Sequence, residues 1–183
     1  MDHNTSGTNW GSNASGTTFT AVDTPTLESL SGGADGSSVT NGQKKTAYEK
    51  FQDAETVDVS LIMAGSGDGT HVDNLVTITE IRKDAVLFAS PERADVVNVA
   101  NSNTQKDNVL DFYNSRSSSS YCVFDSGYKY MYDRYNDVYR FVPLNGDVAG
   151  LCARTDLVSD SWFSPAGFNR GNISCLLYTS DAA

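Results

Sequence analysis

Two short apolar runs on either side of an amphipathic helix pattern constrain the fold of this chain more than any other feature. The first run, LIMAG, closes a segment (residues 56–65) that begins in alternation, and the second, AVLFASP (residues 85–91), stops at a proline. Between them, residues 70–84 place a set of mostly apolar side chains on one helical face: Val72, Leu75, Val76 and Thr79, with Ile78 alongside. The order strand, helix, strand predicts parallel strands joined by a right-handed crossover.

Further elements extend this unit on both sides. Residues 46–55 read as a short helix, and residues 103–116 as a longer one whose inward side chains are Val109, Phe112 and Tyr113. Residues 121–133 and 138–144 read as two strands around the turn RYND. We therefore predict an α/β fold: a mixed sheet with flanking helices and an antiparallel hairpin, preceded by a loop-rich N-terminal segment.

Composition divides the chain into three parts. Residues 1–45 are rich in Gly, Ser, Thr, Asn and Asp and lack apolar periodicity, so we expect a flexible segment or the remnant of an insertion domain. Residues 46–174 form the expected core domain. Residues 175–183, CLLYTSDAA, resemble the in-frame translation of a transposon-type sequencing adapter, and we expect them to be non-biological.

Charge and cysteine content exclude several classes of protein. The formal net charge of -10 repels phosphate backbones, which argues against nucleic-acid binding. No apolar run approaches the roughly 20 residues that a membrane-spanning helix needs, so we expect no membrane insertion. Cys122, Cys152 and Cys175 form no CxxC pair, which predicts neither a zinc site nor a disulfide framework and favours a reducing cytosol. We expect no metal and no cofactor.

The glycine-rich loop GSGDGT, Gly65 to Thr70, supports an alternative function as a nucleotide-binding enzyme domain. It follows a predicted strand and precedes a predicted helix, where backbone amides bind phosphate in dinucleotide-binding folds. The spacing departs from that motif, because Thr70 stands where the third glycine belongs, and Asp68 would repel a phosphate. We interpret the loop as a strand-to-helix connection.

Catalytic motifs are otherwise absent from the sequence, and the only other candidate ligand surface is aromatic. The chain has two histidines, His3 and His71, and neither a GxSxG nor an HExxH motif, so we expect no enzyme. Alternation places three tyrosines on one strand face, with further rings nearby in the hairpin: Tyr128, Tyr130 and Tyr132, then Tyr135, Tyr139 and Phe141. Such a face packs against protein or, as a second alternative, binds carbohydrate.

The least ordinary stretches are FVPLNGDVAGLCARTDL (residues 141–157) and WFSPAGFNRG (residues 162–171). Pro143 ends a predicted strand and Asn145–Gly146 is typical of a turn. A third helix follows, in which Val148, Leu151 and Cys152 share a side and Ala149, Gly150 and Ala153 form a small-residue face; Arg154 and Asp156 are placed to fix its end by hydrogen bonds. Aromatic residues and an arginine are typical of buried interfaces, but the residues alone leave open whether these segments join two copies or close this domain's own core.

These two stretches resemble the signature of contractile tail sheath proteins of myophages. The positions that match the family pattern are Pro143, Gly146, Ala149, Gly150, Ala153, Arg154, Asp156, Pro165 and Ala166. Together with Asn145, Trp162, Asn169 and Arg170, we expect them to form an assembly and packing motif. Residues 54–65 and 80–91 also resemble strand and helix–strand pieces of the sheath core, and the resemblance covers roughly residues 48–173.

The resemblance implies a non-enzymatic, structural role in the phage virion. It implies subunits that assemble in the host cytoplasm as hexameric rings around a tail tube above a baseplate, exchange strands through their terminal arms, and repack when the sheath contracts. Sheath proteins continue beyond this second stretch into a C-terminal arm, and we expect this chain to be a fragment without it.

Overall fold

The structure is a computed structural model that describes residues 32–34, 36–160, 162–168 and 170–173. Most of the predicted flexible segment, residues 1–31 and 35, lies outside the described residues, as do the predicted adapter-derived residues 175–183. The chain divides into two compact units, Met1–Ser38 and Val39–Ala183. All helices and strands described below belong to the second unit.

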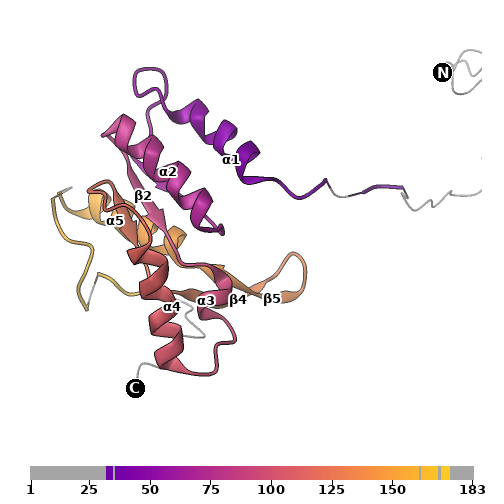
Figure 1. Cartoon of the computed structure of the whole chain (residues 1–183). Coiled ribbons are helices and arrows are strands. Elements are labelled where there is room, and N and C mark those ends of the chain that lie inside the picture. The colour runs from indigo at the N-terminus through magenta and orange to yellow at the C-terminus, as the bar shows by residue number, and fades with distance from the viewer. Residues whose placement is uncertain (1–31, 35, 161, 169, 174–183) are drawn as a thin grey trace, which may run out of the picture. The chain divides into compact units, whose positions relative to one another are not determined.

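A three-stranded parallel sheet forms the centre of this unit (Figure 1). Its strands are β1 (Leu61–Met63), β2 (Val86–Ala89) and β3 (Cys122–Phe124), in the spatial order β1-β2-β3. Helix α2 (Gly69–Arg82) joins the first two strands, and helices α3 (Arg93–Val96) and α4 (Ser102–Asn114) join the second and third. The predicted strand–helix–strand order and the α/β class are confirmed.

The main core lies between this sheet and α2. The helix contributes Val72, Leu75, Val76 and Ile78, the strands contribute Ile62, Leu87 and Ala89, and α4 adds Phe112. The side chains predicted to face inward from α2 are therefore buried. Removing this apolar surface from water is the largest favourable contribution to the stability of such a domain.

The first helix lies earlier in the chain than its predicted position. Helix α1 spans Asn41–Tyr48 and continues as a 3-10 turn, Glu49–Phe51, so the prediction of a helix over residues 46–55 was wrong in its bounds. Thr40 and Gln43 form a capping box that starts the helix at residue 41. After it, the Asp53 carboxylate accepts hydrogen bonds from Glu55 N and the Thr56 hydroxyl, which stabilises a turn instead of further helix.

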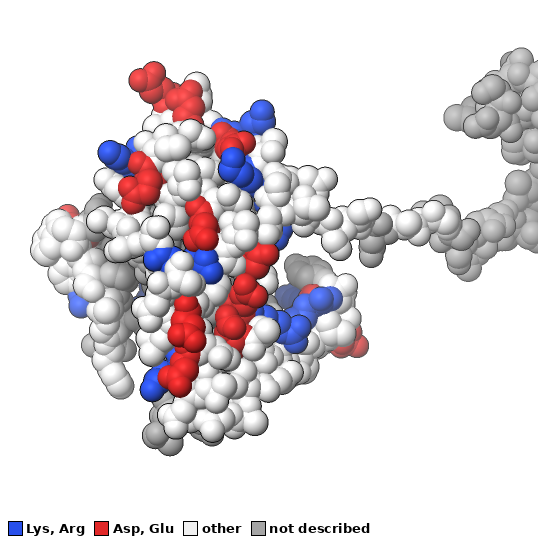
Figure 2. Space-filling model, in the orientation of Figure 1, with Lys and Arg blue, Asp and Glu red and all other residues white. Residues whose placement is uncertain are grey.

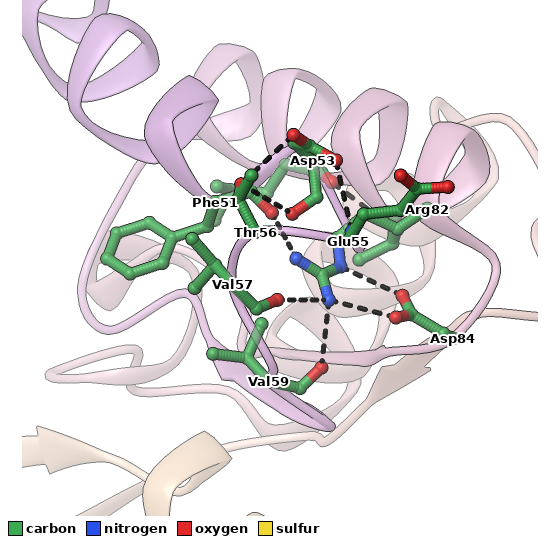
Figure 3. Close-up of polar contacts among 10 residues, drawn as sticks. Phe51, Asp53, Glu55, Thr56, Val57, Val59, Arg82 and Asp84 are labelled. Atoms are coloured by element: carbon green, nitrogen blue, oxygen red, sulfur yellow. Dashed lines mark hydrogen bonds and ion pairs between the residues drawn. The ribbon is translucent and has the colours of Figure 1, made fainter.

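Arg82 ties the end of α2 to the segment that leads into β1 (Figure 3). Its buried guanidinium donates hydrogen bonds to the carbonyls of Phe51, Val57 and Val59 and forms an ion pair with Asp84 at 2.8 Å. Arg82 thereby satisfies loop carbonyls that would otherwise be buried without partners, and Lys83 ends the helix in a left-handed conformation with φ 63°.

The segment predicted as one strand over residues 121–133 is divided into two strands. β3 ends at Phe124, and β4 (Tyr128–Asp133) pairs with β5 (Val138–Pro143) in an antiparallel hairpin that is a sheet of its own. The division occurs because Asp125 accepts a hydrogen bond from Gly127 N at 3.1 Å, which turns the backbone between the strands. The predicted antiparallel hairpin is confirmed, and its strands extend beyond the helices in Figure 1.

The last helix, α5 (Asn145–Val158), follows β5 directly. Pro143 ends β5 as predicted, but the prediction of an Asn145–Gly146 turn was wrong. Both residues belong to the first turn of α5, and neither has a positive φ. The helix packs against β1 and β2.

Candidate assembly surface

The start of α5 sits at the carboxyl ends of the three parallel strands. Asn145 Nδ2 donates to the Gly65 carbonyl, which follows β1, at 2.8 Å, and Asn145 N donates to Ser90 Oγ, which follows β2, at 3.1 Å. Ser90 Oγ in turn donates to Asp125 Oδ2, which follows β3, at 2.6 Å. We call these four residues, Gly65, Ser90, Asp125 and Asn145, the strand-end junction.

The strand-end junction supplies the cap that α5 lacks locally. The residue before the helix, Leu144, offers no side-chain hydrogen bond, so Ser90 from a distant loop accepts the first amide instead. Asp147 in the first turn forms an ion pair with Lys129 of β4 at 2.6 Å. An open groove of about 520 Å³ lies beside these contacts, and its apolar lining includes Met63, Val142 and Pro143.

Asp125 is the carboxyl group of the strand-end junction, and its pKa is raised. Burial is the largest cause and the nearby charge of Asp147 adds to it; with the hydrogen bonds from Ser90 and Gly127 acting in the opposite direction, the pKa is about 6. The carboxyl group therefore titrates close to neutral pH.

Helix α5 has one face that packs against the domain and another that is exposed. Ala149 is 4% exposed and packs inward together with Asn145 and Thr155. Gly150 and Ala153 are exposed, so the predicted single small-residue face is divided. Arg154 and Asp156 are also exposed, and within the described part of the chain neither forms an ion pair, although both were expected to fix the helix end by hydrogen bonds.

Apolar side chains continue this outward face toward the end of the helix and into the segment that follows it. Leu157 is 84% exposed and Val158 67%. We call the exposed residues Gly150, Ala153, Leu157 and Val158 the outer α5 face. Contiguous apolar surface of this kind marks an interaction site more often than a monomer surface.

The second sequence stretch, residues 162–171, is irregular. Trp162 is largely exposed and Phe168 is fully exposed. Phe163 is partly buried, and the Arg170 guanidinium lies 4.3 Å from its ring centre. Arg170 also donates to the Ala166 carbonyl at 3.2 Å. Pro165 is half-buried and Asn169 lies outside the described residues.

The glycine-rich loop at Gly65–Thr70 connects β1 to α2. Carboxylates of the protein itself accept hydrogen bonds from the amides at the start of this helix. Gly69 N donates to Glu92 Oε1 at 3.2 Å and His71 N donates to Asp68 Oδ1 at 2.9 Å. A hydrogen bond from Asn41 and the one from His71 N lower the pKa of Asp68, so its negative charge persists there. This arrangement repels a phosphate, and α5 fills the strand ends where such folds bind nucleotides.

The predicted aromatic face of the hairpin is present as a ladder of rings. Tyr130 stacks on Tyr139 with ring centres 5.2 Å apart, and it contacts Phe141 at 4.7 Å; Tyr132 contacts Tyr139 at 5.1 Å. Tyr128 lies on the same face but is buried, and its hydroxyl donates to the Pro91 carbonyl at 3.1 Å. Tyr135 in the turn is 89% exposed. Most of these rings therefore pack on one another across the two strands.

Charge and thiol chemistry show little that resembles a reactive centre. On the face in Figure 2, basic side chains lie among acidic ones without forming a broad basic surface. Burial raises the pKa of Cys122 to about 12 and also raises that of Cys152, so both thiols stay protonated. Among the described residues, no group of three potential metal ligands comes together, and no helix is long and apolar enough to cross a membrane.

Sequence reasoning found the motif residues of α5 but missed the groups that hold them. Ser90, Asp125 and Lys129 were not singled out. The available signal was positional: a polar residue that directly follows a buried parallel strand lies at the sheet edge where sites usually form.

Comparison with known proteins identifies the family. The chain is 43% identical over 161 residues to the tail sheath protein of Enterobacteria phage T4, an alignment that covers 79% of this chain and 24% of that protein. It is 40% identical over 147 residues to the tail sheath protein of Vibrio phage KVP40, covering 68% and 22%, and 33% identical over 155 residues to that of Salmonella phage ViI, covering 84% and 24%. No family model matches the chain.

These three relatives carry the same description, and the alignments extend over most of the present chain. The chain spans about a quarter of the length of the curated relatives that it matches. The comparisons offer no support for a nucleotide-binding or a carbohydrate-binding role. We conclude that the chain belongs to the family of phage tail sheath proteins.

Proposed function

We propose that this chain is part of the structural subunit of a contractile phage tail sheath. The subunit polymerises as hexameric rings around a tail tube, contacts a baseplate, and contracts to drive the tube through the host envelope. Its role is mechanical and non-enzymatic, and it acts in the virion tail after assembly in the host cytoplasm. The relatives named tail sheath proteins support this proposal.

The observation that carries the proposal is the exposure of the outer α5 face. This surface consists of two small residues, which let another backbone approach closely, followed by two exposed aliphatic side chains. It lies within the stretch that carries the sheath signature. Together with Arg154, Asp156, Trp162 and the 165–170 segment, we assign it to contacts between sheath subunits.

A second feature suits the exchange of strands between subunits. β1 is an edge strand of the parallel sheet, and Met63 on it is 51% exposed. An apolar hollow of about 220 Å³ lies beside it, lined by Tyr48, Phe51, Val59, Leu61, Ile62 and Met63. An extended arm from a neighbouring subunit would find backbone partners along β1 and apolar contacts in this hollow.

The test is assembly of a chain extended to the length of its relatives. We expect rings or tubes in electron micrographs, and we expect Gly150→Leu to abolish them because a bulky side chain blocks close approach at the outer α5 face. Gly42→Leu is the matched control, since Gly42 is also an exposed helical glycine, where an added Cβ would meet only the Thr40 hydroxyl oxygen at 4.0 Å.

Both variants should unfold at temperatures close to that of the parent chain. A strictly monomeric extended chain would overturn the proposed function. If tubes form normally with Gly150→Leu, the proposed sheath role stands, but the outer α5 face is not part of the interface between subunits.

A further inference from the structure

Helix α5 buries few of its side chains fully. Of its fourteen residues Asn145, Ala149 and Thr155 are buried, two of them polar, and the apolar side chains of Val148, Leu151 and Cys152 are half-buried. The Thr155 hydroxyl bonds within the helix, to the Leu151 carbonyl. The attachment of α5 therefore depends heavily on the strand-end junction at its first turn.

Within the strand-end junction, Ser90 connects the helix to a carboxyl group. Its hydroxyl accepts the first amide of α5 and donates its proton to Asp125 Oδ2, while Asp125 Oδ1 accepts from Gly127 N. The Asp125 backbone amide donates to the Ala89 carbonyl at 3.0 Å, which fixes the main chain of Asp125 beside the end of β2. A change in the charge of Asp125 therefore affects the Ser90 hydroxyl and, through it, the hydrogen bond to the first amide of α5.

The groups around Asp125 offer little compensation for a negative charge. The charge of Asp147 on α5 raises the pKa of Asp125, and the charge of Asp125 in turn raises the pKa of Tyr113 on α4 and of Tyr128 on β4. The cation on β4, Lys129, is paired with Asp147. Among the described residues, no lysine, arginine or histidine forms an ion pair with Asp125.

We propose that Asp125 is a pH-sensitive latch for α5: the helix is held firmly when the carboxyl group is protonated and loosens when it ionises. The cause is that Asp125 is a partly buried carboxylate with two hydrogen-bond donors and, among the described residues, no cation paired with it. Its raised pKa of about 6 agrees with this geometry, against an ordinary value of 3.8. A surface carboxylate whose pKa is lowered by folding would act in the opposite direction: its ionisation would strengthen the attachment of the helix.

The direction of the pH effect follows from proton linkage. Because the folded junction binds the proton more tightly than the released one, protonation stabilises the attachment fully below about pH 4. That stabilisation is lost as the pH rises from about 4 to about 6, and α5 is weakest at neutral pH. If the proposed sheath role holds, α5 is then the element that can shift most easily relative to the sheet when subunits repack.

Hydrogen exchange of the isolated 183-residue chain tests the latch without any assembly. We expect the amides of residues 149–158 to be up to about tenfold better protected at about pH 5 than at about pH 7.5, after correction for intrinsic exchange rates. The amides of α2 should change far less. Asp125→Asn, which stays neutral, should keep α5 protected at both pH values.

Asp95→Asn is the matched control. Burial also raises the pKa of Asp95, but its carboxylate bonds to Glu92 N at the start of α3 and not to the junction, so its variant should retain the pH dependence of α5. Ser90→Ala should reduce α5 protection at both pH values, because it removes the acceptor for Asn145 N.

Equal protection of α5 at both pH values in the unmodified chain would overturn the latch, as would faster exchange of α5 in Asp125→Asn at about pH 7.5. If Asp125→Asn failed to fold, as judged by loss of α2 protection, the protection of α5 at the two pH values in the unmodified chain would still test the latch. The proposed function fails separately, by the absence of tubes from the extended chain.

Discussion

Helices α2 and α5 have the same length but are held in different ways. α2 buries eight of its fourteen residues, four of them in the apolar core, and its N-cap is the adjacent Asp68. α5 buries three residues and takes its cap from Ser90, more than fifty residues earlier. The comparison shows that a helix with a broad apolar face is secured by burial. A helix with few buried residues and an exposed face depends more on a few polar contacts, and its exposed face remains available to partners.

The largest effect should come from the core beneath α2. Leu87→Ala removes a side chain with no exposed surface and should lower the free energy of unfolding by about 3 kcal/mol, because a cavity remains in the sheet. Chemical denaturation followed by circular dichroism measures this loss. Leu157→Ala is the matched control on α5, where an 84% exposed side chain should cost less than about 0.5 kcal/mol. Similar losses for both variants would contradict the division between the two helices.

A smaller and more local effect should come from the strand-end junction. Asn145→Ala removes the bond to the Gly65 carbonyl and should cost about 1 to 2 kcal/mol, expressed mainly as faster hydrogen exchange in α5. Asn103→Ala, at an exposed position in the first turn of α4, should be nearly neutral. Equal loss of protection in α2 and α5 would show that the junction supports the whole domain.

The smallest effect should be a gain in the stability of the isolated chain. Gly150 lies in the middle of α5, and a methyl group there meets no atom within 4 Å, so Gly150→Ala should stabilise the isolated chain by about 0.5 to 1 kcal/mol through helix propensity. Thermal unfolding measures it. The same change at Gly69 of α2 should destabilise, because its methyl group would collide with the Arg116 guanidinium, which is paired with Asp73. A loss at Gly150 would mean that the outer α5 face is already covered.

Several elements could be predicted because their signals are local. The buried positions of α2 repeat with the helical period, and β2 (Val86–Ala89) lies in an apolar run that stops at Pro91, so both were found with nearly correct bounds. Helix α1 was misplaced because its start depends on a capping box, Thr40 with Gln43, in a stretch whose composition resembles a loop. The division of residues 121–133 was missed because an apolar and aromatic pattern continues through Asp125, where the chain leaves one sheet for another.

The sequence alone determined the α/β class, the inward face of α2 and the resemblance of residues 141–171 to sheath proteins, because periodicity and motif spacing are properties of neighbouring residues. Only the tertiary structure decided that Asn145 begins a helix, that Ala149 faces inward while Gly150 and Ala153 face outward, and that Ser90 and Asp125 hold the helix start. These facts join residues 35 and 55 positions apart. Hydrogen bonds over such separations depend on how the strand ends meet in space, which no local pattern records.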